Sequence, residues 1–440
     1  MFSRRDLIKL LAPLIVEQIL SVLVGMVDVV MVSSVGEAAV SGVSLVDSIS
    51  ILIIQILSAL ATGGAVISAQ YLGKKQPGNA CRAAGQLLTV TTALSLLVTV
   101  VAIVGNRTIL GAIFGKVEQA VMEDAVIYLE ITSISYPFLA VYNSCAALFR
   151  AMGNSKISMY TSLVMNSINI IGNAVCVFGL HMGVAGVAYP TLISRMVAAV
   201  LMLYLIQQSG NEIRIRRLGE LKPNLLMIKN ILSIGIPNGL ESGMFQFGKI
   251  ALQSLVSSLG TAAIASYAVA SNLVTLLYLP GNAIGLGLIT IVGQCVGAGE
   301  KKQAKDYTKM LVGLNYGILV VICTIMVVFS NVFVGIYQLS WEAAGIAEEM
   351  ITAHSLAMIV WPLAFTLPYT LRASLDAKFT MGISIFSMWV FRIAFAYLFV
   401  RVFHLGVMGV WYGMFIDWVF RAIVFTWRMK GFVKRAISVS

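Results

Sequence analysis

Long apolar segments alternate with short polar ones along the whole chain. Stretches such as 87–104 and 311–329 are apolar almost throughout, whereas a membrane β-strand shows about ten residues of alternating hydrophobicity. A membrane-spanning helix needs about 20 apolar residues, and 12 segments are long enough. The pattern therefore predicts an all-α membrane protein with 12 transmembrane helices. The predicted spans are residues 13–35, 47–70, 83–104, 126–149, 157–180, 185–206, 231–258, 268–296, 307–330, 350–371, 380–400 and 407–427.

The second half of the chain repeats the first. Residues 32–40 (VSSVGEAAV) correspond to 256–264 (VSSLGTAAI) at an offset of 224, which also relates Pro13 to Pro237. Each copy has six predicted spans, so both copies enter the membrane from the same side, as in the parallel repeats of some secondary transporters. We expect an N-terminal six-helix lobe (1–206), a cytoplasmic linker (207–230), and a C-terminal six-helix lobe with a short cytoplasmic tail (231–440).

Composition and charge support a membrane protein. Of the 440 residues, 59% are hydrophobic and 11% are charged, with a mean hydropathy of +0.92, whereas soluble domains carry roughly 25% charged residues. The net charge of +11 does not indicate a nucleic-acid partner, because 23 of the 30 Lys and Arg residues lie in loops on one side of the predicted spans and only three on the other. Basic loops stay in the cytoplasm. We therefore expect both termini in the cytoplasm, and a multi-pass protein of the cell (plasma or inner) membrane whose basic loops face anionic lipid headgroups.

The sequence contains no pattern typical of an enzyme. The five cysteines have no metal or redox spacing, and the three histidines form no metal-binding pair. The first apolar segment runs past 20 residues without a small-x-small cleavage pattern, so we expect an uncleaved first helix. We predict no catalytic residue, no metal centre and no cofactor apart from a coupling ion.

Few ionisable residues lie inside the predicted spans, and each is a functional candidate because such a group costs at least about 2.5 to 3.5 kcal/mol there. Asp28 has no basic residue in its own span, so its charge needs water, a cation or a proton from elsewhere. It is the first candidate for ion coupling, and the alternative is a protonated Asp at a helix interface. The whole set is Glu17, Asp28, Asp47, Arg195, Glu241, Lys249, Arg392, Asp417 and Arg421.

The span 157–180 carries a polar stripe. Asn166, Asn169 and Asn173 are spaced i, i+3 and i+7, which places them on one helical face. Amide oxygens beside a carboxylate suit a small hard cation, and amide hydrogens can bind a substrate or a protonated acid. The alternative is hydrogen bonding between packed helices.

The C-terminal lobe carries a different set of charges. Asp417 and Arg421 are spaced i, i+4, which favours a structural ion pair. Glu241 and Lys249 lie about 12 Å apart along one helix and cannot pair, so both are predicted to face a substrate cavity. Arg392 occupies the repeat position of Asn169, so the lobes differ in charge at equivalent depth.

Glu17 and Glu241 each follow a proline, Pro13 and Pro237. The prolines either start their helices or bend them near a site, and on the second interpretation Glu17 joins Glu241, Lys249 and Arg392 as a predicted substrate-cavity residue.

Four segments, taken in order, resemble the multidrug and toxic compound extrusion (MATE) family in its DinF-like branch. They are 26–32 (MVDVVMV, ending at Gly36), 70–75 (QYLGKK), 148–156 (LFRAMGNSK), and Phe391 with Arg392. The resemblance covers essentially all 12 spans and implies a V-shaped pair of six-helix bundles that exports organic cations in exchange for Na⁺ or H⁺.

The resemblance also implies a site in the N-terminal lobe. Carried over by motif, its residues are Asp28, Asn143, Asn169, Asn173 and Thr191. Family members often have Asp at the position of Asn173, so a two-carboxylate site is reduced here to one, which leaves the identity and number of coupling ions open. The NorM-like branch would place an acid one turn beyond Glu241, where this chain has Phe245, and this argues against a NorM-like cation site.

We therefore predict a secondary active multidrug exporter that works by alternating access. It would exchange organic cations or amphiphiles for H⁺ or Na⁺, with any Na⁺ bound at Asp28, and would function as a monomer in the lipid bilayer. The alternative is a flippase for lipid-linked precursors or oligosaccharides from the same superfamily, in which Lys249, Arg392 and Arg195 would meet phosphates. A receptor or scaffold is disfavoured because no soluble domain is predicted to transmit a signal.

Overall fold

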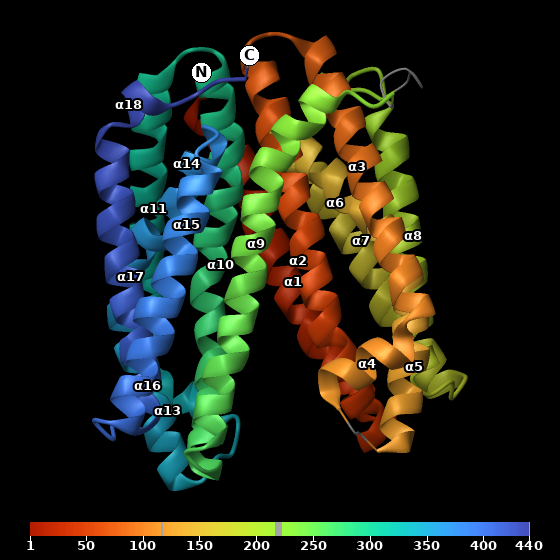
Figure 1. Ribbon diagram of the computed structural model, residues 1–440, viewed down its shortest axis with the longest axis vertical. Coiled ribbons are helices and arrows are strands. Elements are labelled where there is room, and N and C mark those ends of the chain that lie inside the picture. The colour runs from red at the N-terminus through yellow and green to blue at the C-terminus, as the bar shows by residue number, and fades with distance from the viewer. Residues whose placement is uncertain (116–117, 216–221, 440) are drawn as a thin grey trace. The chain divides into compact units, whose positions relative to one another are not determined.

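The computed structural model describes residues 1–115, 118–215 and 222–439, and these ranges contain helices and no strand. The chain divides into two compact units, residues 2–239 and residues 240–438. Within each unit the long helices run side by side along the same direction (Figure 1).

In its described residues, the first unit contains eight α-helices, one π-helix and the first part of α9. These are α1 (Arg4–Ser33), α2 (Glu37–Gly73), α3 (Pro77–Val104), α4 (Asn106–Phe114), α5 (Gln119–Ile134), α6 (Tyr136–Ala151), α7 (Ser155–Ala174), the π-helix η1 (Val175–Gly179) and α8 (Ala185–Ile206). Ser3 and Asp6 form a capping box at the start of α1, which satisfies two backbone N–H groups that a helix start leaves free. In this unit α2 packs on α3, α5 and α6, while α7 packs on α1 and α8.

The second unit follows the same order from α9 onward. Its elements are α9 (Leu225–Ser257), α10 (Thr261–Gly297), α11 (Lys301–Val328), α12 (Ser330–Gly335), α13 (Trp341–Ala357), the π-helix η3 (Pro362–Thr366), α14 (Leu367–Ala373), α15 (Ala377–Ser387), the π-helix η4 (Met388–Ile393), α16 (Ala394–Arg401), α17 (Gly406–Lys430) and α18 (Phe432–Arg435). Helix α10 packs on α11, α13 and α14, and α17 packs on α16 and both π-helices.

The helices account for the predicted spans. Within the described ranges, nine helices are long and apolar enough to cross a membrane, and two bent helix pairs bring the number to 11. Helix α9 carries Lys229, Glu241 and Lys249 and is the twelfth long segment. The all-α, 12-span fold class is confirmed.

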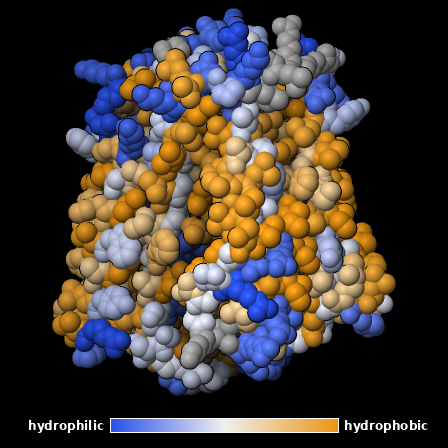
Figure 2. Space-filling model, turned by 45° about the vertical axis from the view of Figure 1, so that its right-hand side comes forward, coloured by the Kyte–Doolittle hydropathy of each residue, from blue (hydrophilic) through white to orange (hydrophobic). Residues whose placement is uncertain are grey.

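The outward faces of the helices are apolar. Val100 and Val104 on α3 are 58% and 82% exposed, and Ile171 on α7 is 65% exposed. Figure 2 shows hydrophobic residues along the sides of the helices and hydrophilic residues toward their ends. Exposed apolar surface on this scale marks contact with lipid, and the chain is a multi-pass membrane protein.

The repeat is present in the backbone as well as in the sequence. Gly36 and Gly260, which precede α2 and α10, have φ values of 140° and 97°, a region that L side chains rarely adopt. His181 and His404 also match, with φ values of 50° and 52°. Since these residues are related by the offsets of 224 and 223, the two copies fold through the same turns.

Among the described helices, each unit has one bent span at an equivalent proline. The axes of α5 and α6 differ by 45°, and those of α13 and the η3–α14 segment by 65°. Pro137 lies in the first turn of α6, and Pro362 starts η3. A proline lacks the N–H that would continue the preceding helix, so the repeated proline explains the repeated bend.

Pro13 and Pro237 are not helix-start residues. Both lie inside long helices, because α1 begins at Arg4 and α9 begins at Leu225. The helix-start interpretation of these two prolines is wrong.

The division between the units falls inside α9, at residues 239 and 240. The first turns of α9 belong to the first unit, where a side chain on Gly63 would meet the Ile231 carbonyl at 2.5 Å and one on Gly235 would meet Leu60 at 2.7 Å. Between α8 and α9, residues 216–221 of the predicted linker lie outside the described ranges. The domain limits 206 and 231 stay sequence predictions.

Candidate functional site

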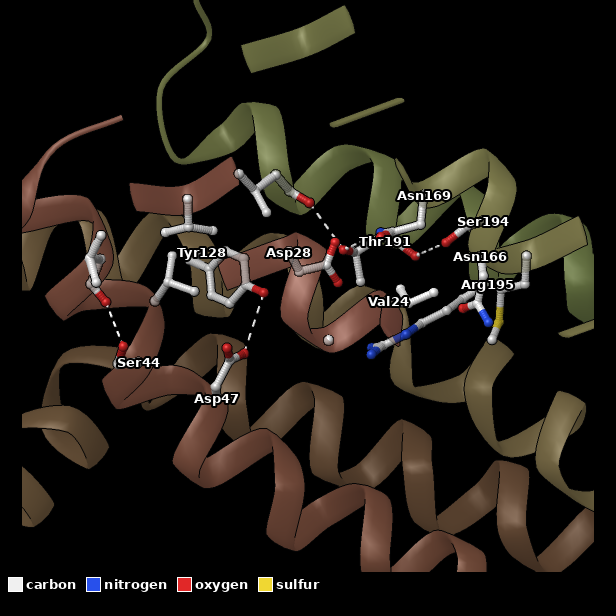
Figure 3. Close-up of a pocket in the computed structure, with 16 residues that line it drawn as sticks. Val24, Asp28, Ser44, Asp47, Tyr128, Asn166, Asn169, Thr191, Ser194 and Arg195 are labelled. Carbon is white, nitrogen blue, oxygen red and sulfur yellow. Dashed lines mark hydrogen bonds between the residues drawn. The ribbon is translucent and has the colours of Figure 1, made fainter. Parts of the chain in front are cut away.

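The first unit contains a cavity of about 260 Å³ among α1, α2, α5, α7 and α8 (Figure 3). Two carboxylates, Asp28 of α1 and Asp47 of α2, lie in its wall together with polar residues of α7 and α8. Its other lining residues are Val24, Gly25, Val32, Val40, Val43, Ser44, Tyr128, Met165, Asn166, Asn169, Val187, Thr191, Ser194 and Arg195. The apolar members leave room for a hydrophobic ligand beside a small number of charged groups.

A chain of hydrogen bonds leads from Asp28 to α8. Asn173 Nδ2 donates to Asp28 Oδ1 at 3.0 Å and to Asn169 Oδ1 at 3.3 Å, and Asn169 Nδ2 donates to Thr191 Oγ1 at 3.0 Å. Thr191 in turn donates to the Val187 carbonyl at 3.0 Å. Four of the five residues predicted for ion coupling are therefore linked, each to the next, by hydrogen bonds.

Local packing explains why these side chains meet. Asn169 and Asn173 are one turn apart on α7, so they share a face. Gly172 brings α7 close to α8, because a Cβ at this position would lie 2.7 Å from the Pro190 side chain. Asn169 is 7% exposed and Asn173 fully buried, so the amides are held between helices rather than facing lipid.

Among the described residues, one polar atom of the hydrogen-bonded series from Asp28 to Thr191 has no partner. Asn173 Oδ1 is buried and, among the described residues, accepts no hydrogen bond. A buried amide oxygen without a donor is costly. The atom lies on the same amide that contacts Asp28, so it can accept a hydrogen bond from a protonated Asp28 or coordinate a cation.

Asp47, Tyr128 and Arg195 extend the site. Tyr128 donates to Asp47 Oδ1 at 3.4 Å, and Arg195 Nη1 donates to Ser135 Oγ at 2.7 Å, at the break between α5 and α6. In Figure 3, Arg195 extends from α8 toward the side of the cavity where Asp28 and Asp47 lie. The sequence marked Asp47 and Arg195 only as ionisable residues in apolar segments and gave no signal for Tyr128.

Asn143 and Asn166 occupy different surroundings. Asn143 is half-buried on α6 and does not line the cavity with Asp28. Asn166 does line it, and its Nδ2 donates to Ser162 Oγ at 3.3 Å.

Glu17 and Glu241 form equivalent ion pairs, one in each unit. Glu17 lies 3.5 Å from Arg150 Nη1, and both of its carboxylate oxygens accept from Ser158 Oγ, at 3.0 and 2.9 Å. Both oxygens of Glu241 accept from Arg372 Nη2 at 2.8 Å. Each carboxylate is held by an arginine of its own unit, which the sequence did not indicate, and the placement of Glu17 and Glu241 in a substrate cavity stays a prediction.

The second unit contains a charged cluster around Asp417. Asp417 Oδ1 accepts from Arg421 Nε at 2.8 Å, which confirms the predicted i, i+4 pair. Arg392 Nη1 lies 4.0 Å from Asp417 Oδ2. Arg392 and Lys249 both lie over the ring of Phe245, 5.0 and 5.4 Å from its centroid, so these two predicted cavity residues are neighbours.

The oxygen atoms around Asp28 are suited to a hard cation. Carboxylate, amide and hydroxyl oxygens are the ligands that such ions use, and Asp28, Asn169, Asn173 and Thr191 supply all three kinds. No group of three or more His, Cys, Asp or Glu side chains that could hold a metal ion occurs in the described part of the chain.

Comparisons with known proteins place these features in a family. The family model MatE matches residues 13–175 and 237–398, so its two matches begin 224 residues apart, at the offset of the internal repeat. A relative from Bacillus subtilis, named "Uncharacterized transporter YisQ", is 26% identical over 98% of this chain and 96% of its own. Another, "Probable multidrug resistance protein NorM" of Thermotoga maritima, is 26% identical over 95% of this chain and 90% of its own.

Solved structures share the fold. A crystal structure of MATE in complex with MaL6 has a TM-score of 0.91 with 21% identity, covering 98% of this chain and 97% of the other. An outward-facing multidrug resistance MATE family transporter of the MOP superfamily has a TM-score of 0.90 with 20% identity, covering 98% and 96%.

Proposed function

The chain belongs to the MATE family of multidrug efflux transporters, and we propose that it exports organic cations or amphiphiles in exchange for H⁺ or Na⁺. It works by alternating access in the cell membrane, as a monomer with both termini in the cytoplasm. The alternative activity of a lipid-linked precursor or oligosaccharide flippase is not favoured by the family comparisons.

The observation that carries this proposal is the hydrogen-bonded chain that starts at Asp28 in the wall of the cavity. Asp28 is an acid in a membrane-spanning helix, and its one hydrogen bond among the described residues comes from the neutral amide of Asn173. An acid in such a position is a functional candidate because an unneutralised charge is costly there. A proton, a Na⁺ ion or a cationic substrate can each neutralise it.

Exchange follows from competition for one carboxylate. A bound proton or Na⁺ neutralises Asp28 and removes its attraction for an organic cation, so loading one species releases the other. Coupling also requires that each species bind the outward-open and inward-open states with different affinity. The apolar lining of the cavity accepts varied hydrophobic groups, which suits a multidrug substrate range.

The coupling ion is identified by separating the two gradients. Purified protein is reconstituted in vesicles, and export of a fluorescent organic cation is followed under a pure Na⁺ gradient and then under a pure pH gradient. The gradient that supports transport identifies the ion, and transport under neither gradient contradicts the antiport mechanism.

The Asp28→Asn variant tests the site itself. We expect export to fall to the rate of protein-free vesicles, because the amide cannot exchange one cation for another, while the amount of inserted protein is unchanged. Glu123→Gln, which removes an exposed acid from the same unit, is the matched control and should export normally. Export by Asp28→Asn at the wild-type rate would refute the assignment.

A further inference from the structure

The internal repeat identifies a second set of residues that corresponds to the cavity lining of the first unit. At the offsets of 224 and 223, four neutral lining residues have charged or larger polar counterparts in the second unit. Gly25 corresponds to Lys249, Val43 to Tyr267, Asn169 to Arg392 and Ser194 to Asp417. Asp28 itself corresponds to Leu252. At the equivalent positions the second unit therefore lacks Asp28, Asp47 and Arg195 and carries Lys249, Arg392 and Asp417 instead, so the balance of charge changes from negative to positive.

These two cations lie next to each other. The Lys249 ammonium and the Arg392 guanidinium share the ring of Phe245, with centroid distances of 5.4 and 5.0 Å. Two like charges on one aromatic ring repel each other, and the ring attracts each of them only modestly. The arrangement needs a negative charge nearby.

One acid of the second unit, Asp417, supplies only part of that charge. Asp417 is bonded through Oδ1 to Arg421 at 2.8 Å, and its Oδ2 stays 4.0 Å from Arg392, beyond hydrogen-bond distance. Glu241, on the same helix as Lys249, is held by Arg372. Asp417 is shared between Arg421 and Arg392, so the cluster of Lys249, Arg392 and Arg421 keeps an excess of positive charge.

Arg392 also has an unused donor. Arg392 is 8% exposed, and its Nε atom has no hydrogen-bond partner among the described residues. A buried charge with an unsatisfied donor is strongly unfavourable. Arg392 lies in the π-helix η4, and such irregular turns occur frequently at functional sites.

We propose that Arg392 and Lys249 form a binding site for a carboxylate on the transported molecule, so that the exporter prefers zwitterionic amphiphiles to purely cationic ones. This inference rests on the proposed export function and specifies its substrate class. The planar guanidinium presents paired N–H donors that match the two oxygens of a carboxylate. Lys249 is exposed and adds a second positive charge, and Phe245 offers an apolar surface to the adjoining part of the ligand.

A pair of dyes that differ in one group tests the site. Tetramethylrhodamine carries a delocalised cation and a free carboxylate, whereas its methyl ester keeps the cation and lacks the negative charge. Binding of both dyes to the purified full-length protein is measured by fluorescence polarisation. We expect the free acid to bind about tenfold more tightly than the ester, the effect of one charge-assisted hydrogen bond.

Variants of Lys249 and Arg392 test whether these two residues cause the preference for the acid over the ester. Lys249→Gln and Arg392→Gln should each weaken binding of the acid and leave the ester unchanged, which brings the affinity ratio toward one. Arg392→Lys and Lys249→Arg, which keep the charge, should retain part of the preference. Lys302→Gln removes an exposed cation elsewhere in the same unit and should leave the ratio at its wild-type value.

Two results would overturn the proposal: equal affinities of the wild-type protein for acid and ester, or an unchanged ratio in Lys249→Gln. The second variant decides the matter even if Arg392→Gln does not fold, because Lys249 is exposed. Binding in detergent needs no ion gradient, so a preference for the acid together with absent transport would refute the export function and leave the anion site standing.

Discussion

Asn173 connects the acid of the first unit to the rest of its polar chain. Its amide donates to both Asp28 and Asn169, and its oxygen is the one atom of that amide without a partner. Rotating the amide by half a turn would present this oxygen to a protonated Asp28. At the residue scale, a single side chain can thus accommodate both protonation states of the acid.

Asn173→Asp places a second carboxylate beside Asp28. Two close carboxylates cannot both stay ionised without a counter-ion, so we expect the variant to carry more coupling ions per exported molecule. The ratio of ion flux to dye flux in vesicles measures this change. Asn166→Asp adds an acid to the same helix face beside Ser162 and is the matched control; equal ratios in the two variants would contradict the assigned role of Asn173.

Asp417 is the one carboxylate in the cationic cluster of the second unit and is fully buried. Asp417→Asn leaves Arg421 and Arg392 without their acid, and breaking a buried ion pair in this way costs about 3 to 5 kcal/mol. We expect a clear loss of thermal stability in detergent. Asp306→Asn, at an exposed position, should change it little, and equal melting temperatures for both variants would show that the pair is not stabilising.

At the scale of elements, close helix contacts hold Arg392 in place. Gly413 on α17 lies against the backbone of η4 and α16, where an added Cβ would be 2.8 Å from the Arg392 carbonyl oxygen and 2.8 Å from the Ala396 nitrogen. Backbone atoms cannot move aside as a flexible side chain can. The absence of a side chain at Gly413 is therefore what lets α17 approach this π-helix.

Gly413→Ala should lower stability by about 1 to 3 kcal/mol, the usual cost of overpacking, and should weaken the preference for the carboxylate dye by displacing Arg392. Thermal unfolding and the dye ratio measure the two effects. In α11, a Cβ on Gly317 meets nothing within 4 Å, so Gly317→Ala is the control. An unaltered melting temperature in Gly413→Ala would contradict the packing argument.

At the scale of the whole molecule, the two units share a repeated fold and differ in the charges they carry at equivalent positions. Both units share turns, bent spans and an arginine–glutamate pair. The first unit lines its cavity with Asp28, Asp47 and Arg195, whereas the second places Lys249 and Arg392 on one ring beside Asp417. Duplication explains the common scaffold, and substitution at equivalent positions explains how one molecule can attract both signs of charge.

The membrane orientation is tested by cysteine labelling. In a cysteine-free background, we expect a cysteine at Lys302 to react with a membrane-impermeant maleimide only after cells are opened, because this basic loop is predicted to be cytoplasmic. A cysteine at Arg107 should react in intact cells. The opposite pattern would show that the termini lie outside the cytoplasm.

Sequence alone determined what depends on local or periodic order. Hydropathy marked the 12 helical segments because a lipid-facing helix is apolar along its whole length, and the offset of 224 marked the repeat. The pair of Asp417 and Arg421 was predictable because residues four apart meet on any α-helix.

Tertiary structure decided which distant residues meet. Glu17 and Arg150, or Tyr128 and Asp47, are far apart in the sequence, and hydropathy carries no information about the face on which a side chain finds its partner. For this reason the arginine partners of Glu17 and Glu241 were not predictable from the sequence. The shared ring of Lys249 and Arg392, and the chain from Asp28 to Thr191, likewise depend on how the helices pack.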